Sequence, residues 1–178
     1  TACYLLCETY RVKPGATILV HAAAGGVGLI LCQWAKHLGA TVIGTVGSRK
    51  KASLARAHGC DHAIVYTEQN FAERVRRITK GAGVPVVYDG VGKTTFEGSL
   101  DCLSPRGMFV SYGNASGVVP PVSPALLTAK GSLYMTRPSL VTYTAARDDL
   151  VRTARRLFAV VKSGAVKIEV NQRYALKD

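Results

Sequence analysis

The sequence has no run of about 18 or more apolar residues, and its first residues do not have the charged, apolar and small-residue order of a secretory signal. Its five cysteines are an odd number and include no CxxC pair. These absences argue against a membrane span, a secretory leader and a zinc site. We therefore expect a soluble, cytoplasmic protein with free thiols and no bound metal.

Acidic residues are scarce. Eleven Asp and Glu face 23 Lys and Arg, for a net charge of +12. Such a charge suits nucleic acid, an anionic cofactor or an acidic partner domain. The basic residues gather at 49–51, 74–77 and 152–156, and the last two groups fit solvated helix faces. An RNA-binding surface should interleave aromatic side chains on a basic face, and the sequence shows no such pattern.

Short apolar, β-branched runs alternate with segments of helical period. The strand-like runs are residues 17–20, 41–46, 62–66, 84–88, 108–112 and 132–135. The helical segments are residues 27–38, 50–58, 71–79, 94–103 and 124–129, and Thr94 and Glu97 have the spacing of a capping box. Strict alternation with near-continuous apolar strands predicts a doubly wound α/β fold with a parallel sheet covered on both faces.

The two ends depart from this alternation. Residues 1–10 are typical of the last turns of a helix, and residues 144–162 predict a long helix capped by Gly164. A further strand is expected at residues 166–170. We expect residues 1–16 to be a helix end and linker, residues 17–165 to be the main domain, and residues 166–178 to begin a return to another domain.

A glycine-rich motif, HAAAGGVG at residues 21–28, lies between the first strand and the first helix. Ala23, Gly25 and Gly28 occupy the three glycine positions of the dinucleotide fingerprint. Small residues there permit the tight turn, the approach of the pyrophosphate to the backbone, and close packing of the helix on the sheet. The helix N-terminus then offers free N–H groups to the phosphates. The motif predicts dinucleotide binding.

The end of the second strand indicates which dinucleotide binds. An NAD enzyme usually has an acid about 20 residues past the glycines, whereas an NADP enzyme has basic residues there. Here no acid appears before Asp61, and Ser48, Arg49 and Lys51 can bind a phosphate instead. Cations at a helix N-terminus are unfavourable for the helix dipole unless an anion lies between them. The pattern therefore favours NADPH.

Four separated motifs carry a family resemblance. Residues 21–48, together with VVYDGVG (86–92), FVSYGNASG (109–117) and GSLYMTRPSL (131–140), resemble the NADPH-dependent quinone reductases of the medium-chain dehydrogenase/reductase superfamily, the group that includes zeta-crystallin. The resemblance implies a six-stranded Rossmann domain inserted into a catalytic domain that this chain mostly lacks. It also implies hydride transfer from NADPH to a quinone without a metal, and a homodimer paired through an edge strand at residues 131–136.

The resemblance also implies a set of cofactor contacts. The residues near the phosphates are Thr1, Gly26 and Val27, and those around the 2′-phosphate are Gly47, Ser48 and Lys51. Tyr66 and Val91 would border the adenosine, and the nicotinamide half would meet Tyr112, Gly113, Asn114, Ala115, Pro138, Ser139 and Leu140. Gly25, Gly28 and Arg49 join this set from the motifs described above. Gly90 stands where the family pattern has a serine.

No catalytic residue is assigned, because the cofactor carries the hydride chemistry in such enzymes. His21 at the end of a buried strand fits a hydrogen-bonded structural histidine, and Asp89 fits a carboxylate that fixes a loop. Three alternatives stay open: an enoyl-thioester reductase of the same superfamily, a zinc alcohol dehydrogenase, and a non-catalytic NADPH- or RNA-binding protein.

Overall fold

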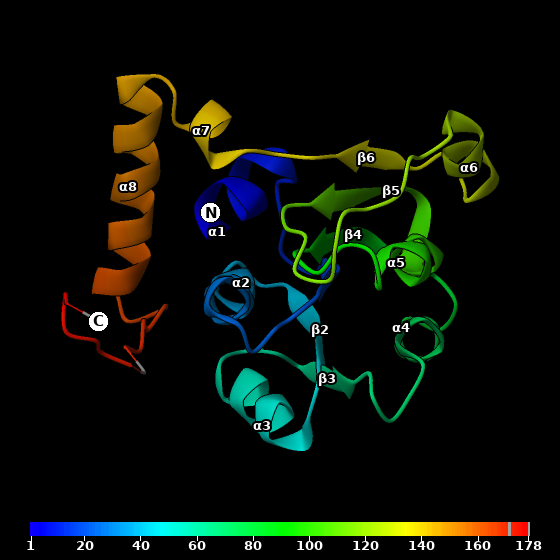
Figure 1. Cartoon of the computed structure of the whole chain (residues 1–178), viewed down its shortest axis with the longest axis horizontal. Coiled ribbons are helices and arrows are strands. Elements are labelled where there is room, and N and C mark those ends of the chain that lie inside the picture. Colours follow the sequence, from blue (N-terminus) through cyan, green and yellow to red (C-terminus); the bar gives the residue numbers. More distant parts are fainter. Residues whose placement is uncertain (171, 178) are drawn as a thin grey trace.

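Six parallel strands form one sheet in the order β3-β2-β1-β4-β5-β6. The computed structural model describes residues 1–170 and 172–177. The strands are β1 (Thr17–Val20), β2 (Thr41–Val46), β3 (His62–Val65), β4 (Val84–Asp89), β5 (Leu103–Ser111) and β6 (Tyr134–Thr136). The predicted doubly wound six-stranded Rossmann sheet is confirmed (Figure 1).

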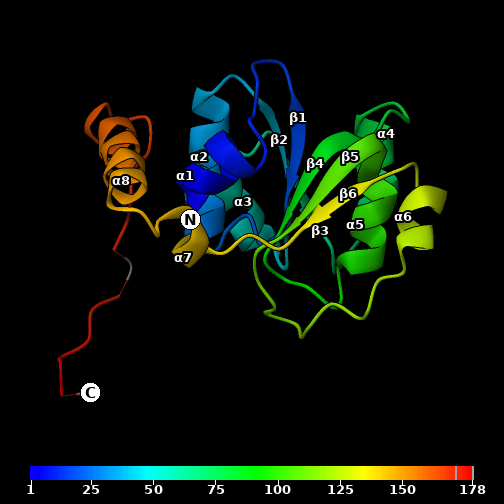
Figure 2. The same ribbon diagram turned by 90° about the horizontal axis from the view of Figure 1, so that it is seen from above.

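Helices cover both faces of this sheet because each helix buries one apolar stripe. On one face lie α2 (Gly26–His37) and α3 (Arg49–Ala57), and on the other lie α4 (Phe71–Ile78), α5 (Phe96–Cys102) and α6 (Pro124–Ala129) (Figures 1 and 2). In α2 the buried stripe includes Leu31, Trp34 and Ala35. No helix among the described residues is long and apolar enough to cross a bilayer.

The predicted capping box at Thr94 is wrong. Helix α5 follows Thr95, which makes no side-chain capping bond. The Thr95 hydroxyl instead donates to Asp89 Oδ2 at 2.7 Å. A buried carboxylate is the stronger acceptor, so the loop contact replaces the cap.

The terminal segments lie together at one side of the sheet. The chain starts with α1 (Ala2–Tyr4) and a π-helical turn, η1 (Leu5–Thr9), and α8 (Arg147–Lys162) packs against α1 (Figure 2). The predicted helix over 144–162 is thus shorter at its start, and a separate short helix, α7 (Leu140–Tyr143), precedes it.

The strand expected at residues 166–170 does not form. The Lys167 N–H donates to Gln33 Oε1 at 2.8 Å, and its carbonyl accepts from Gln33 Nε2 at 3.1 Å. A side chain of α2 thus takes the backbone bonds that a neighbouring strand would provide. Residues 171 and 178 of the predicted 166–178 segment lie outside the described residues, and the predicted domain division stays a prediction.

Candidate functional site

The candidate site lies at the carboxyl ends of the strands, where the strand order reverses. β1 has β2 on one side and β4 on the other, so the connections leaving β1 and β4 run in opposite directions. The crevice outside such a reversal is where open α/β sheets bind ligands. Residues 21–28, the glycine loop, begin at this point.

Backbone hydrogen bonds within the glycine loop and to β2 hold the loop in place. The Gly25 N–H donates to Ala22 O at 2.8 Å, and the Ala23 N–H donates to Thr45 O at 3.0 Å. Ala22 has a φ of 51°, a left-handed conformation that is strained for a residue with a side chain. A Cβ on Gly26 would meet nothing within 4 Å, so this position at the start of α2 is open to a ligand.

A buried polar network around His21 holds the start of the glycine loop. His21 is fully buried, with Nδ1 2.8 Å from Thr45 Oγ1 and Nε2 2.9 Å from Ser99 Oγ. Burial lowers the pKa of His21, and the charge of Asp89 opposes this shift only in part. Both ring nitrogens are occupied, which confirms the structural role predicted for His21.

Asp89 organises the turn after β4. Its Oδ1 accepts from the N–H groups of Val91 at 2.7 Å and Gly92 at 3.0 Å, and its Oδ2 accepts from Thr95. The carboxylate is fully buried. The geometry confirms the prediction that Asp89 fixes a loop.

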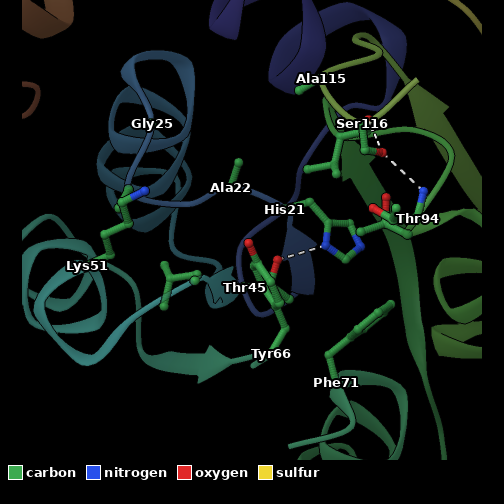
Figure 3. Close-up of a pocket in the computed structure, with 15 residues that line it drawn as sticks. His21, Ala22, Gly25, Thr45, Lys51, Tyr66, Phe71, Thr94, Ala115 and Ser116 are labelled. Atoms are coloured by element: carbon green, nitrogen blue, oxygen red, sulfur yellow. Dashed lines mark hydrogen bonds between the residues drawn. The ribbon is translucent and has the colours of Figure 1, made fainter. Parts of the chain in front are cut away.

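A cavity of about 660 Å³ opens beside the glycine loop. We call it the adenosine-side cavity, because Tyr66 and Val91, the residues that the resemblance implies beside the adenosine, line it. It is lined by His21, Ala22, Ala24, Gly25, Thr45, Val46, Gly47, Lys51, Tyr66, Phe71, Val91, Thr94, Thr95, Ala115 and Ser116 (Figure 3). Its volume falls within the range of small-molecule sites. A Cβ on Gly47 would lie 2.9 Å from the Tyr66 hydroxyl, so a larger residue at position 47 would push the exposed Tyr66 side chain aside.

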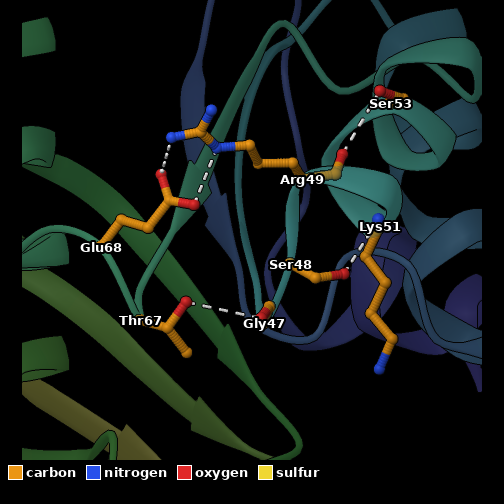
Figure 4. A network of polar contacts seen from close by, with 7 residues as sticks. All are labelled: Gly47, Ser48, Arg49, Lys51, Ser53, Thr67 and Glu68. Carbon is orange, nitrogen blue, oxygen red and sulfur yellow. Dashed lines mark hydrogen bonds and ion pairs between the residues drawn. The ribbon is translucent and has the colours of Figure 1, made fainter.

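The three residues predicted to bind the phosphate, Ser48, Arg49 and Lys51, make different contacts in the structure. Ser48 Oγ caps α3 by accepting from the Lys51 N–H at 3.3 Å. Arg49 Nε donates to Glu68 Oε1 at 2.9 Å, and Arg49 and Lys51 extend in different directions (Figure 4). Of the three, Lys51 alone lines the adenosine-side cavity. The Arg49 side chain is 84% exposed, so water screens its ion pair with Glu68 and the pair adds little to stability.

A second cavity of about 630 Å³ has Val27 of α2 in its wall. We call it the nicotinamide-side cavity, because most of the residues that the resemblance implies beside the nicotinamide half line it. It is lined by Thr1, Tyr4, Val27, Tyr112, Gly113, Arg137, Pro138, Ser139 and Leu140. Arg137 Nη1 donates to the carbonyl oxygens of Ser111 at 3.2 Å and Gly113 at 3.1 Å, which ties β6 to the end of β5. Burial raises the pKa of Tyr112, so its phenol stays neutral.

The structure brings most of the predicted contacts into these two cavities. Gly25, Gly47, Lys51, Tyr66, Val91 and Ala115 line the first, and Thr1, Val27, Tyr112, Gly113, Pro138, Ser139 and Leu140 line the second. Gly26, Gly28, Ser48, Arg49 and Asn114 line neither. Whether each residue contacts a cofactor stays a prediction.

Sequence reasoning missed several lining residues. Tyr4 enters the nicotinamide-side cavity from α1, where it stacks on Tyr143 with ring centroids 4.7 Å apart. Phe71 lies at the start of α4, and its ring meets the His21 ring edge to face, with the two ring centroids 5.0 Å apart. Their positions along the sequence carry no signal for this role, because only the tertiary structure brings them to the glycine loop.

Several known proteins are similar to this chain in sequence and in structure. The chain is 56% identical over 180 residues to a quinone oxidoreductase of Salmonella typhimurium, a match that covers 100% of this chain and 55% of that protein. It is 51% identical to a 2-haloacrylate reductase of Burkholderia, covering 100% and 54%. The Escherichia coli quinone oxidoreductase complexed with NADPH superposes with a TM-score of 0.92 at 51% identity, covering 95% of this chain and 52% of that one.

These matches confirm the resemblance to quinone oxidoreductases, and the chain spans about half the length of the relatives it matches. The family model that matches residues 26–157 is described as zinc-binding dehydrogenase. Within the described part of the chain, no three His, Cys, Asp or Glu side chains gather as metal ligands, so these residues do not fit a zinc site. On the match over residues 26–157, the chain belongs to the zinc-binding dehydrogenase family.

Proposed function

We propose that this chain is the NADPH-binding domain of an enzyme that reduces quinones. The observation that carries the proposal is a pair of cavities that share the start of α2 in their walls, Gly25 in the first and Val27 in the second. Among the described residues that line the adenosine-side cavity, Lys51 is present and no Asp or Glu is. The pyrophosphate would lie against the glycine loop, where free N–H groups and the helix dipole favour anions. The adenosine and nicotinamide halves would then occupy the cavities named for them.

The chain's residues would bind and orient the cofactor. Lys51 offers a charge to the 2′-phosphate, Tyr66 offers a ring face to the adenine, and Arg137 holds the strand ends that border the nicotinamide. When bound, NADPH supplies the hydride from its dihydronicotinamide ring. The Escherichia coli relative complexed with NADPH supports this assignment.

The first expected result concerns cofactor choice. Lys51→Ala should weaken NADPH binding on the order of tenfold, because it removes a charge-assisted hydrogen bond to the 2′-phosphate. NADH binding should be unchanged, because NADH has no 2′-phosphate. Isothermal titration of both cofactors measures this. Lys50→Ala is the matched control, since Lys50 is exposed on the same turn and outside the cavity.

The same titration tests Arg49. Arg49→Ala should weaken NADPH binding, because the exposed ion pair of Arg49 with Glu68 is weak enough for the 2′-phosphate to displace it. Equal NADPH and NADH affinities in the unchanged protein would contradict the proposed 2′-phosphate site.

The second expected result concerns turnover. Residues 1–178 alone should bind NADPH but reduce quinones no faster than free NADPH does, because positioning the acceptor supplies much of the rate enhancement. The whole protein should reduce quinones with saturation. The 2-haloacrylate reductase among the relatives makes activated alkenes the second acceptor class to assay. Saturable quinone turnover by residues 1–178 would contradict the division into two domains.

The third expected result concerns assembly. We propose that two copies pair through β6, an edge strand on which Tyr134 is 59% exposed. Tyr134→Lys should shift the dimer to monomer in light scattering at micromolar concentration, whereas Phe158→Lys on α8 should not. Leu133→Pro is unsuitable, because Leu133 is buried and its N–H donates to Leu127 O. A monomer in the unchanged protein would contradict this proposal. Cytoplasmic location stays a prediction.

A further inference from the structure

Two thiols lie one helical turn apart in the first segment of the chain, and the proposed hydride transfer uses neither. Cys3 belongs to α1 and is 3% exposed, whereas Cys7 belongs to η1 and is partly exposed. Each thiol changes the pKa of the other: Cys7 raises that of Cys3, and Cys3 lowers that of Cys7. Of the two, Cys7 is the thiol with access to solvent.

Cys7 lines a third cavity, of about 340 Å³, whose walls combine basic and apolar side chains. Arg11, Lys13 and Arg156 line it together with the thiol. The nearby acid is Glu8, which Arg156 Nη1 contacts at 3.2 Å and Arg152 Nη2 at 3.7 Å. Arg152 Nη2 also contacts Asp149 Oδ1 at 2.6 Å, so these two acids balance Arg152 and Arg156. The excess positive charge around Cys7 comes from Arg11 and Lys13.

These surroundings activate the sulfur. The neighbouring Cys3 thiol lowers the pKa of Cys7 to about 7, with help from the charges of Arg156 and Arg11 and against the opposing effects of burial and Glu8. Cys102 is the contrast, because burial raises its pKa to about 12. A thiolate in a cationic, accessible setting is the reactive form of cysteine.

We propose that Cys7 is a site of thiol–disulfide exchange with small anionic disulfides of the glutathione disulfide class. The Cys7 thiolate attacks one sulfur of the disulfide, and the bond between the two small-molecule sulfurs breaks. A mixed disulfide forms on Cys7, and the other half leaves as a thiolate that takes up the proton Cys7 lost. Cys7 is oxidised, the leaving sulfur is reduced, and Arg11 and Lys13 hold the carboxylates of the bound half.

Mass spectrometry of the whole protein after incubation with glutathione disulfide tests this step. We expect one adduct, located on Cys7 by peptide mapping, with a rate that rises with pH through a midpoint near 7. Cys7→Ser should abolish the adduct, and Cys102 should stay unmodified. Cys3→Ala should move the midpoint up toward the ordinary thiol value of about 8.5.

The charge of the cavity is tested separately. Arg11→Gln combined with Lys13→Gln should slow the reaction of Cys7 with glutathione disulfide on the order of tenfold. The rate with the neutral 2-hydroxyethyl disulfide should be unchanged. Circular dichroism confirms that each variant is folded. Equal slowing of both reagents, first modification of another cysteine, or a midpoint above 8 in the unchanged protein would each overturn the proposal. None of these outcomes depends on NADPH binding.

Discussion

Gly28→Ala should abolish NADPH binding and lower the free energy of unfolding by about 3 kcal/mol, at the upper end of overpacking costs. The added Cβ would lie 2.2 Å from Ala22 O and 2.9 Å from the backbone of Ala23. These atoms cannot move aside, because Gly25 and Thr45 hold them by hydrogen bonds. The N-terminus of α2 must therefore shift, and with it the N–H groups that we propose bind the pyrophosphate.

Urea unfolding and cofactor titration measure the two effects in the same variant. Gly26→Ala is the matched control, because its Cβ would meet nothing within 4 Å. Its stability should stay within about 0.5 kcal/mol of the unchanged protein, and any loss of NADPH affinity would then report a contact with the ligand itself. Equal stability of the two variants would contradict the close approach of α2 to β1.

Asp89→Ala should be as damaging to stability as the glycine change, at about 3 kcal/mol or more. The substitution removes a fully buried carboxylate that accepts from the Val91 and Gly92 N–H groups and from the Thr95 hydroxyl. Each buried donor left unsatisfied costs about 1–3 kcal/mol. Chemical denaturation measures the loss. The turn after β4 borders the adenosine-side cavity, so NADPH affinity should also fall.

Asp101→Ala is the control for the loss of a carboxylate. Asp101 is exposed and pairs with Lys130 at the surface, where an ion pair contributes about 0–1 kcal/mol. A similar loss from both substitutions would show that the Asp89 bonds do not hold the turn.

Local sequence was sufficient for the strands and helices near the site. The bounds of β1, β2 and α6 agree with the predicted ranges. The reason is that alternation, β-branched runs and the residues that start and stop helices are properties of neighbouring residues. The glycine loop was predictable for the same reason, since small residues are required where a tight turn lies between a strand and a helix.

Tertiary structure decided the rest. Lys51 and Arg49 are two residues apart, yet α3 directs one toward the cavity and the position of Glu68 draws the other away. Tyr4 and Arg137 meet at the nicotinamide-side cavity from opposite ends of the chain. The sequence by itself determined a parallel sheet with a dinucleotide loop, because period and turn chemistry are local. Only the tertiary structure decided which side chains face the cavities and which thiol faces the basic residues, because those contacts join segments far apart in the chain.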